Sequence, residues 1–263
     1  MKKISKIYMA LLLAFLYVPI FVLIVFSFNT TKSRTVFEGF TFDWYIRLFQ
    51  NELILTSLRN TIIISVLAAT ISTILGTAAA IGINNMRKIP KAVVMNINSF
   101  PIINPEIVTG VSLMLLFVFF AARMNFSFGF GTLLIAHITF DVPYVILNVM
   151  PKFRQMNPNL YEAAQDLGCN SIMAFFKVVM PEIMPGIVSG FLMSFTFSLD
   201  DFIISYFTSG ATSQTLPITI YSMTRRKVSP EINALSTIIF VVVVIVLIAK
   251  NMIEKKNRKE DKI

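Results

Sequence analysis

The chain has 263 residues, 56% of them hydrophobic, and a formal net charge of +9. Soluble domains are about 45–50% apolar and lack apolar runs of about 20 residues, so the several runs here exclude an ordinary soluble fold. They predict an all-α polytopic membrane protein. Nucleic-acid binding is not expected, because Lys and Arg collect in the cytoplasmic loops of membrane proteins. The single cysteine excludes an internal disulfide, and the single histidine argues against a metal site.

Six transmembrane helices are predicted, each near the roughly 20 residues needed to cross the hydrocarbon. Their expected ranges are 7–28, 58–83, 102–122, 132–150, 186–207 and 232–251. The first run lacks a small-x-small cleavage site and exceeds the about 7–15 apolar residues of a secretory signal, so we interpret it as an uncleaved span. Prolines interrupt the third and fourth spans. A membrane helix tolerates proline where neighbouring helices satisfy the freed carbonyls, which predicts a packed bundle.

Lys and Arg predict the orientation of the chain. They are more numerous at the two termini and in the second and fourth connections, which places both termini in the cytoplasm. The 152–182 connection is then cytoplasmic as well. The expected segments are an N-terminal tail and first span (1–28), an external loop (29–55), the main transmembrane domain (56–251) and a basic cytoplasmic tail (252–263). We expect the basic tail to lie beside anionic membrane lipid.

Small residues recur at every fourth position in two of the predicted spans. The two sets are Ala68, Ser72, Gly76 and Ala80, and Gly186, Gly190, Ser194 and Ser198. Such stripes allow helix backbones to approach closely, and this packing drives helix association in lipid. The stripes therefore predict a helix bundle or an oligomer, and they carry no information about a substrate.

Four acidic residues fall within predicted spans, namely Glu106, which is interpreted as a carboxylate at a helix N-terminus, and three aspartates. Asp200 and Asp201 are expected in the outer half of the fifth span, and Asp141 lies in the fourth. A charge at membrane depth costs about 2.5–3.5 kcal/mol, so these side chains should face the bundle interior or a water-filled cavity. They form either a site for a cationic substrate or structural ion pairs, and the residues alone leave both readings open. His137 is expected to be a packed or cavity-facing histidine rather than a metal ligand.

No motif for catalysis or for nucleotide binding is visible. No Gly is followed by Lys, so a phosphate-binding loop that ends in Gly-Lys-Ser/Thr is absent. The sequence also lacks His-x-x-x-His, paired cysteines and Gly-x-Ser-x-Gly. We therefore expect no catalytic residues, metal or cofactor in this chain. If the chain moves a solute uphill, the energy must come from another subunit or from an ion gradient.

Between the fourth and fifth spans, residues 160–181 form the longest central stretch that does not resemble membrane. It fits two short amphipathic helices joined at Gly168, which can adopt the left-handed conformation that ends a helix. Pro158 and Asn159 can open the first helix, Asn170 or Ser171 can cap the second, and Pro181 is expected to stop it. A polar helix–turn–helix between two spans suits the docking of a partner.

The spacing in this stretch resembles a known signature. Glu162-Ala163-Ala164, Gly168 four positions later and Val178-x-Met180-Pro181 are similar to the Glu-Ala-Ala-x3-Gly-x9-Ile-x-Leu-Pro signature of permease subunits of bacterial ATP-binding-cassette importers. The replacement of Ile and Leu by Val and Met is conservative for an apolar contact. The resemblance implies a coupling helix that docks in a cleft of the ATPase subunit, with the coupling residues Glu162, Ala163, Ala164, Gly168 and Pro181.

Further motifs resemble the second permease subunit of spermidine/putrescine importers, namely residues 136–140, 198–202, 216–222 and 228–234. The resemblance implies a type I importer permease in the bacterial cell membrane that forms half of a two-permease pore. It also implies a second permease subunit, two ATPase subunits that bind the ATP, and an external polyamine-binding protein.

For the substrate pathway, the same resemblance favours Asp200 and Asp201. Carboxylates with aromatic walls such as Phe202 and Tyr206 suit the ammonium groups of a polycation. Asp141 matches no motif of the family and is a candidate only through its place within a span. Three alternatives remain. One is an importer permease for another small solute, and another is a proton-coupled transporter that uses Asp141 or Asp200, which leaves the 160–181 helices unexplained. The third is an intramembrane enzyme or assembly factor, which the missing nucleophile and metal ligands disfavour.

Overall fold

The structure is a computed structural model that describes residues 2–31, 33, 36–124, 126–157, 159–226, 230–241 and 244. It contains two compact units, one drawn from residues 1–55 and 220–263 and the other from residues 56–219. Within the described ranges, the only β interaction is an isolated bridge between Asn29 and Phe40. All named elements are helices, which confirms the predicted all-α class.

The first unit contains α1 (Lys2–Phe26), α2 (Asp43–Gln50) and the apolar helix Pro230–Val241. Asn29 organises the connection between α1 and α2. Its side-chain amide donates to the Val36 carbonyl (2.8 Å), and its side-chain oxygen accepts from the Glu38 amide (3.0 Å). The indole N–H of Trp44 in turn donates to the Asn29 carbonyl at 2.6 Å. These bonds fix the position at which α2 begins.

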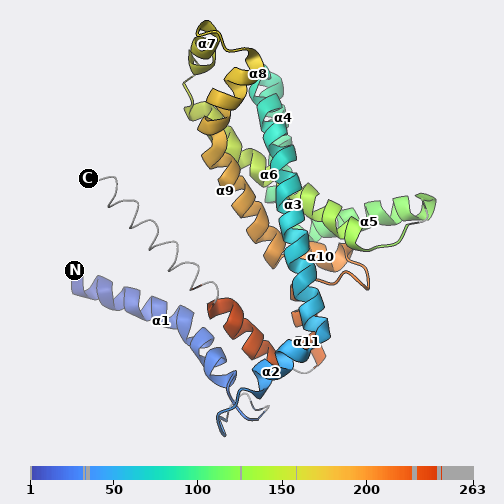
Figure 1. The fold of residues 1–263 in the computed structure, drawn as a ribbon. Coiled ribbons are helices and arrows are strands. Elements are labelled where there is room, and N and C mark those ends of the chain that lie inside the picture. The colour runs from blue at the N-terminus through green and yellow to red at the C-terminus, as the bar shows by residue number, and fades with distance from the viewer. Residues whose placement is uncertain are drawn as a thin grey trace. The chain divides into compact units, whose positions relative to one another are not determined.

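The second unit is a bundle in which α6 lies between α3 and α9 (Figure 1). Its elements are α3 (Glu52–Asn84), α4 (Lys88–Ile103), α5 (Glu106–Met124), α6 (Phe130–Gln155), α7 (Asn159–Asp166), α8 (Ser171–Ala174), a π-helical turn (Phe175–Val179), α9 (Met180–Asp200), α10 (Ile203–Thr208) and α11 (Leu216–Arg226). The first residues of α3 and the last residues of α11 belong to the first unit.

Both predicted stripes of small residues form helix contacts. A Cβ on Gly76 of α3 would lie 2.6 Å from the Val145 Cβ of α6. Val145 also meets α9, because a Cβ on Gly190 of α9 would lie 3.2 Å from the Val145 Cα, and one on Gly186 would lie 3.2 Å from the Val149 Cα. These distances leave no room for a larger side chain, so the predicted packed bundle is confirmed.

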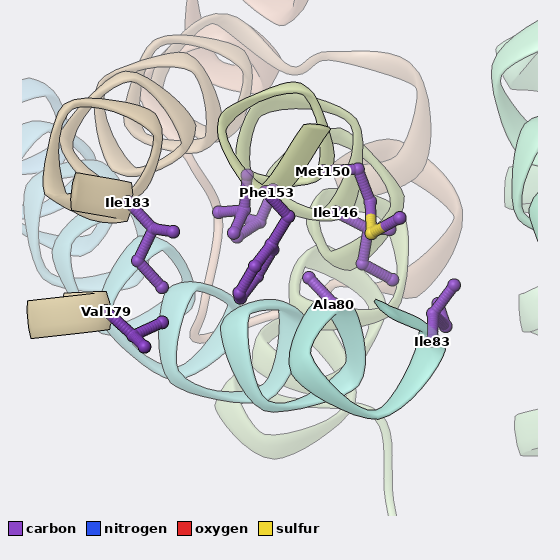
Figure 2. Packing of buried hydrophobic residues seen from close by; sticks show 9 residues of the cluster. Ala80, Ile83, Ile146, Met150, Phe153, Val179 and Ile183 are labelled. Atoms are coloured by element: carbon purple, nitrogen blue, oxygen red, sulfur yellow. The ribbon is translucent and has the colours of Figure 1, made fainter. Parts of the chain in front are cut away.

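A hydrophobic core joins the same three helices near their ends (Figure 2). Phe153 of α6 lies in this core together with Ala80 and Ile83 of α3. Val179 of the π-helical turn and Ile183 of α9 complete it. The core therefore ties the segment between α6 and α9 to the bundle.

Five described helices are long and apolar enough to cross a membrane, namely Ser5–Phe26, Glu52–Asn84, Glu106–Met124, Phe130–Gln155 and Ser171–Asp200. The predicted sixth span lies partly outside the described residues, so the number six stays a prediction. Its first part forms the helix Pro230–Val241. The basic tail 252–263 lies wholly outside the described residues.

The predicted third span, 102–122, is wrong at its start. Ile102 belongs to α4, a separate helix in a stretch where the sequence predicted no helix before residue 102. The chain breaks at Asn104, which has an extended backbone (φ −70°, ψ 141°), and α5 begins at Glu106. Pro105 explains the break, because a proline disfavours the helical conformation of the residue before it and lacks the N–H that would continue the helix.

The predicted fifth span, 186–207, is wrong at both ends. Pro181 does not stop the helix that starts at Ser171, which continues through the π-helical turn into α9. The π-helical hydrogen bonds precede Pro181 and widen the turn into which its ring must fit. At the other end, α9 stops at Asp200, and α10 begins only at Ile203.

Candidate functional site

The predicted turn between the two short helices of the 160–181 stretch is present. Gly168 has φ +88°, the left-handed conformation that glycine adopts without a steric penalty. The Cys169 amide donates to the Ala164 carbonyl (3.0 Å) and the Gly168 amide to the Gln165 carbonyl (2.8 Å), a pair of bonds that satisfies the end of α7. The Asn170 side chain then accepts from the Met173 amide (2.7 Å) and caps α8. Pro158, the predicted first-turn proline, lies outside the described residues.

The α7–α8 segment has one face on the bundle and one face exposed. Ala164 is buried, whereas Glu162, Ala163, Gly168 and Pro181 are exposed. Apolar side chains are exposed around the turn between the helices, namely Leu167, Ile172, Met173 and Phe176. Exposed apolar side chains that surround a single turn are typical of a surface that binds a partner.

Behind the exposed face, a cleft of about 590 Å³ separates α7 from the ends of α3 and α6. Tyr161 of α7 and Phe175 of the π-helical turn line it, and both pack against the core that contains Phe153. The contacts of Tyr161 and Phe175 with the core thus hold the α7–α8 segment beside this cleft. The segment is also continuous with α9 through the π-helical turn.

The second candidate region is the break between α9 and α10, where the two predicted aspartates have different environments. Asp200 is exposed, and it forms no hydrogen bond or ion pair with any described residue. The Asp201 side chain is only 5% exposed. Its two carboxylate oxygens accept from the backbone amides of Ile204 (3.2 Å) and Ser205 (2.6 Å), in the first turn of α10.

His137 of α6 joins the two sides of this break. Its Nδ1 lies 2.6 Å from the Ser198 Oγ of α9, and its Nε2 lies 2.9 Å from the Ser205 Oγ of α10. The same Nε2 is 3.6 Å from the Asp201 carboxylate. The sequence predicted a packed or cavity-facing His137 but not these partners. The only signal for them was the position of two serines within one turn of Asp201 on either side.

Of the remaining candidates, two aromatic residues lie together and Asp141 lies elsewhere. Phe202 and Tyr206 have ring centroids 5.6 Å apart, and the Tyr206 side chain is 51% exposed. Asp141 is fully buried in α6, one helical turn beyond His137, and neither of its oxygens has a hydrogen-bond partner among the described residues. The structure therefore leaves Asp200 and Tyr206 exposed on the two sides of the α9–α10 break, with Phe202 half-buried beside Tyr206, and it leaves Asp141 inside the bundle.

Comparisons with known proteins identify the family to which the chain belongs. Residues 72–259 match the family of binding-protein-dependent transport system inner membrane components. The chain is 36% identical to the spermidine/putrescine transport system permease protein PotC of Haemophilus influenzae, over 95% of this chain and 96% of that protein. It is 37% identical to the putrescine transport system permease protein PotI of Escherichia coli, over 86% and 81%.

The fold is similar to that of solved ABC transporters. A bacterial alginate ABC transporter, solved in complex with an alginate pentasaccharide-bound periplasmic protein, contains a chain with a TM-score of 0.71. It is 21% identical, and the match covers 95% of this chain and 94% of that chain. This likeness bears on the fold alone. The protein belongs to the binding-protein-dependent transport system inner membrane component family, the permease subunits of ABC importers.

Proposed function

We propose that the chain is the permease subunit of an ATP-driven polyamine importer and forms half of its translocation pore with a second permease subunit. The observation that carries the proposal is the 36–37% identity to permeases named for spermidine and putrescine, which extends over 86–95% of this chain. Identity over this length includes the membrane helices as well as the 160–181 stretch, so it supports a shared substrate class as well as a shared fold.

In this proposal the α7–α8 segment is the coupling element for a pair of cytoplasmic ATPase subunits, which bind the ATP. Glu162 and Ala163 would meet the ATPase together with the exposed apolar side chains at Leu167 and Ile172. Because the helix runs without a stop from Ser171 to Asp200, a displacement of α8 would tilt α9 as a rigid element. The chain itself would bind no cofactor.

The proposed topology has six spans with both termini in the cytoplasm. Residues 29–55 then form an external loop, residues 56–251 the importer domain and residues 252–263 a basic tail near lipid. An external polyamine-binding protein would dock on the outer face. The complex of an alginate transporter with a periplasmic protein is a precedent for such docking within this fold.

The substrate pathway in this proposal passes the α9–α10 break. Asp200 offers an exposed carboxylate, and Phe202 and Tyr206 offer aromatic faces. Ammonium groups bind carboxylates through charge-assisted hydrogen bonds and bind aromatic rings through cation–π contacts. An elongated polycation can use both kinds of contact at once.

Reconstitution tests the proposal. The complete complex, with its ATPase subunits, second permease and binding protein, is placed in liposomes, and uptake of labelled spermidine is measured with and without ATP. We expect ATP-dependent uptake that unlabelled putrescine or spermidine reduces and that amino acids leave unchanged. Uptake driven by an ion gradient without ATP, or ATP-dependent uptake of a different solute only, would overturn the proposal.

A further inference from the structure

We propose that the adjacent aspartates have separate tasks in transport. Asp200 contacts the ammonium group of the passing polyamine, whereas Asp201 is a positioning residue that holds the α9–α10 break through α10 and His137. This inference rests on the polyamine substrate of the proposed function and adds a division of labour between two residues that the sequence could not distinguish.

The hydrogen bonds of Asp201 leave little of its carboxylate for a ligand. One oxygen accepts from the Ile204 amide, and the other accepts from the Ser205 amide and faces the His137 ring. The side chain is almost completely buried. A substrate ammonium group would have to replace bonds that orient the first turn of α10, so Asp201 is better suited to fix the backbone than to bind cargo.

His137 extends this support across the break. Its two ring nitrogens contact Ser198 on the α9 side and Ser205 on the α10 side. One imidazole on α6 therefore sets the direction in which α10 leaves α9. Phe202 and Tyr206 belong to this turn and helix, so the position of their rings depends on the same contacts.

Asp200 points in a different direction. It follows Ser198, which faces α6, by two residues, or about 200° around the helix axis. Ser189 and Thr196 lie within about 40° of Asp200 on the helix surface, and both are exposed. The hydroxyls of Ser189 and Thr196 donate to carbonyls of their own helix and are compatible with lipid, whereas a carboxylate within a span is not. The face that carries Asp200 therefore borders water or a partner subunit. In a half-pore, that face is the natural boundary of the pathway.

Chemical protection tests the assignment of Asp200. In a Cys169→Ser background, Thr196→Cys, which lies one helical turn from Asp200 at an exposed position, is placed in the complete complex either with Asp200 intact or with Asp200→Asn. Both variants are treated with a positively charged thiol reagent, with and without saturating spermidine. We expect spermidine to slow the modification at least fivefold when Asp200 is intact and to have little effect with Asp200→Asn. Equal protection in the two variants, or no protection in either, would overturn the proposal.

Thermal unfolding of the complex tests the assignment of Asp201 without thiol chemistry. We expect His137→Ala and Asp201→Ala to lower the melting temperature by amounts that do not add in the double variant, because both remove the same support. His137→Ala and Asp200→Ala should be additive, with Asp200→Ala causing little change. Coupling of His137 to Asp200 instead of to Asp201 would contradict the division of labour.

The conservative variants separate binding from positioning. Asp200→Glu keeps the charge on a flexible exposed side chain and should retain most spermidine uptake, whereas Asp200→Asn should lose at least tenfold. Asp201→Glu should not retain normal spermidine uptake, because the extra methylene moves the carboxylate out of the position in which it accepts from both backbone amides. If the wild-type complex imports no polyamine, the proposed function fails. If it imports polyamine and these variants behave alike, only the present inference fails.

Discussion

The His137 Nδ1 lies 2.6 Å from the Ser198 Oγ, and this contact belongs to a regular register between α6 and α9. Eight residues further along α6 and eight residues back along α9, Val145 lies against Gly190. Asp141 and Ser194 occupy the positions halfway between these two contacts in the sequence, and both are fully buried without hydrogen-bond partners among the described residues. The α6–α9 interface thus contains the His137–Ser198 contact at one point and close backbone packing at another.

The glycines of this interface should tolerate no enlargement. Gly190→Leu would drive a side chain into the Val145 backbone, and overpacking of this kind costs about 1–3 kcal/mol. We expect a clear fall in the melting temperature of the purified protein in detergent. Gly82→Leu is the matched control, because a Cβ there meets nothing within 4 Å. An equal effect of both substitutions would contradict the close packing.

Asp141 should be replaceable by its neutral isostere. A buried carboxylate without a partner is unfavourable at membrane depth by about 2.5–3.5 kcal/mol, so Asp141→Asn should keep or raise the melting temperature. Asp141→Leu is the control, because it removes the polar group altogether. A marked loss of stability with Asn would mean that the carboxylate has a partner that makes it structurally necessary. A stable Asp141→Asn protein that fails to transport would instead place Asp141 in the substrate pathway.

The core behind the α7–α8 segment should be needed for coupling as well as for stability. Phe153→Ala leaves a cavity among α3, α6 and the π-helical turn, at a cost of about 3–5 kcal/mol. We expect a lower melting temperature and less spermidine uptake for each ATP hydrolysed. Leu147→Ala, at an exposed position of α6, should change neither quantity. A normal ratio of uptake to hydrolysis in a folded Phe153→Ala protein would separate this core from coupling.

The turn at Gly168 should require glycine. Gly168→Ala forces a Cβ into a left-handed conformation that costs roughly 1–2 kcal/mol, and it should weaken association with the ATPase subunits. Gly131→Ala is a suitable control, because its backbone lies outside that region and a Cβ there has open space. Co-purification of the ATPase with each variant, measured at equal expression, gives the comparison. Equal recovery with both variants would contradict a role for this turn in docking.

Local and non-local features of this protein differ in how far the sequence predicts them. The apolar runs, the stripes around Gly76 and Gly190, and the left-handed Gly168 each follow from residues close together in the chain, and the structure contains all of them. Hydropathy does not reveal where a helix breaks. It therefore missed α4 as a helix and the stop at Asp200, both of which depend on backbone geometry rather than on polarity.

The sequence also predicts the candidate site only in part, because the roles of its residues depend on non-local contacts. Sequence reasoning identified Asp200 and Asp201 but gave them one role, because adjacent residues of one type look alike until their partners are known. Asp201 is distinguished by His137, 64 positions earlier in the chain, and by backbone amides that become available only after α9 has ended. Contacts of this range depend on the packing of α6 against α9 and α10.

The central claim is that the 160–181 stretch couples ATP hydrolysis in partner subunits to polyamine import. Simultaneous measurement of ATP hydrolysis and labelled spermidine uptake tests it most directly, with complete complexes that carry either the wild-type chain or Glu162→Lys combined with Gly168→Asp. The account predicts that wild-type liposomes accumulate spermidine in proportion to the ATP hydrolysed, and that the double variant loses both the uptake and the bound ATPase. Normal uptake and normal ATPase recovery in the double variant would contradict the account.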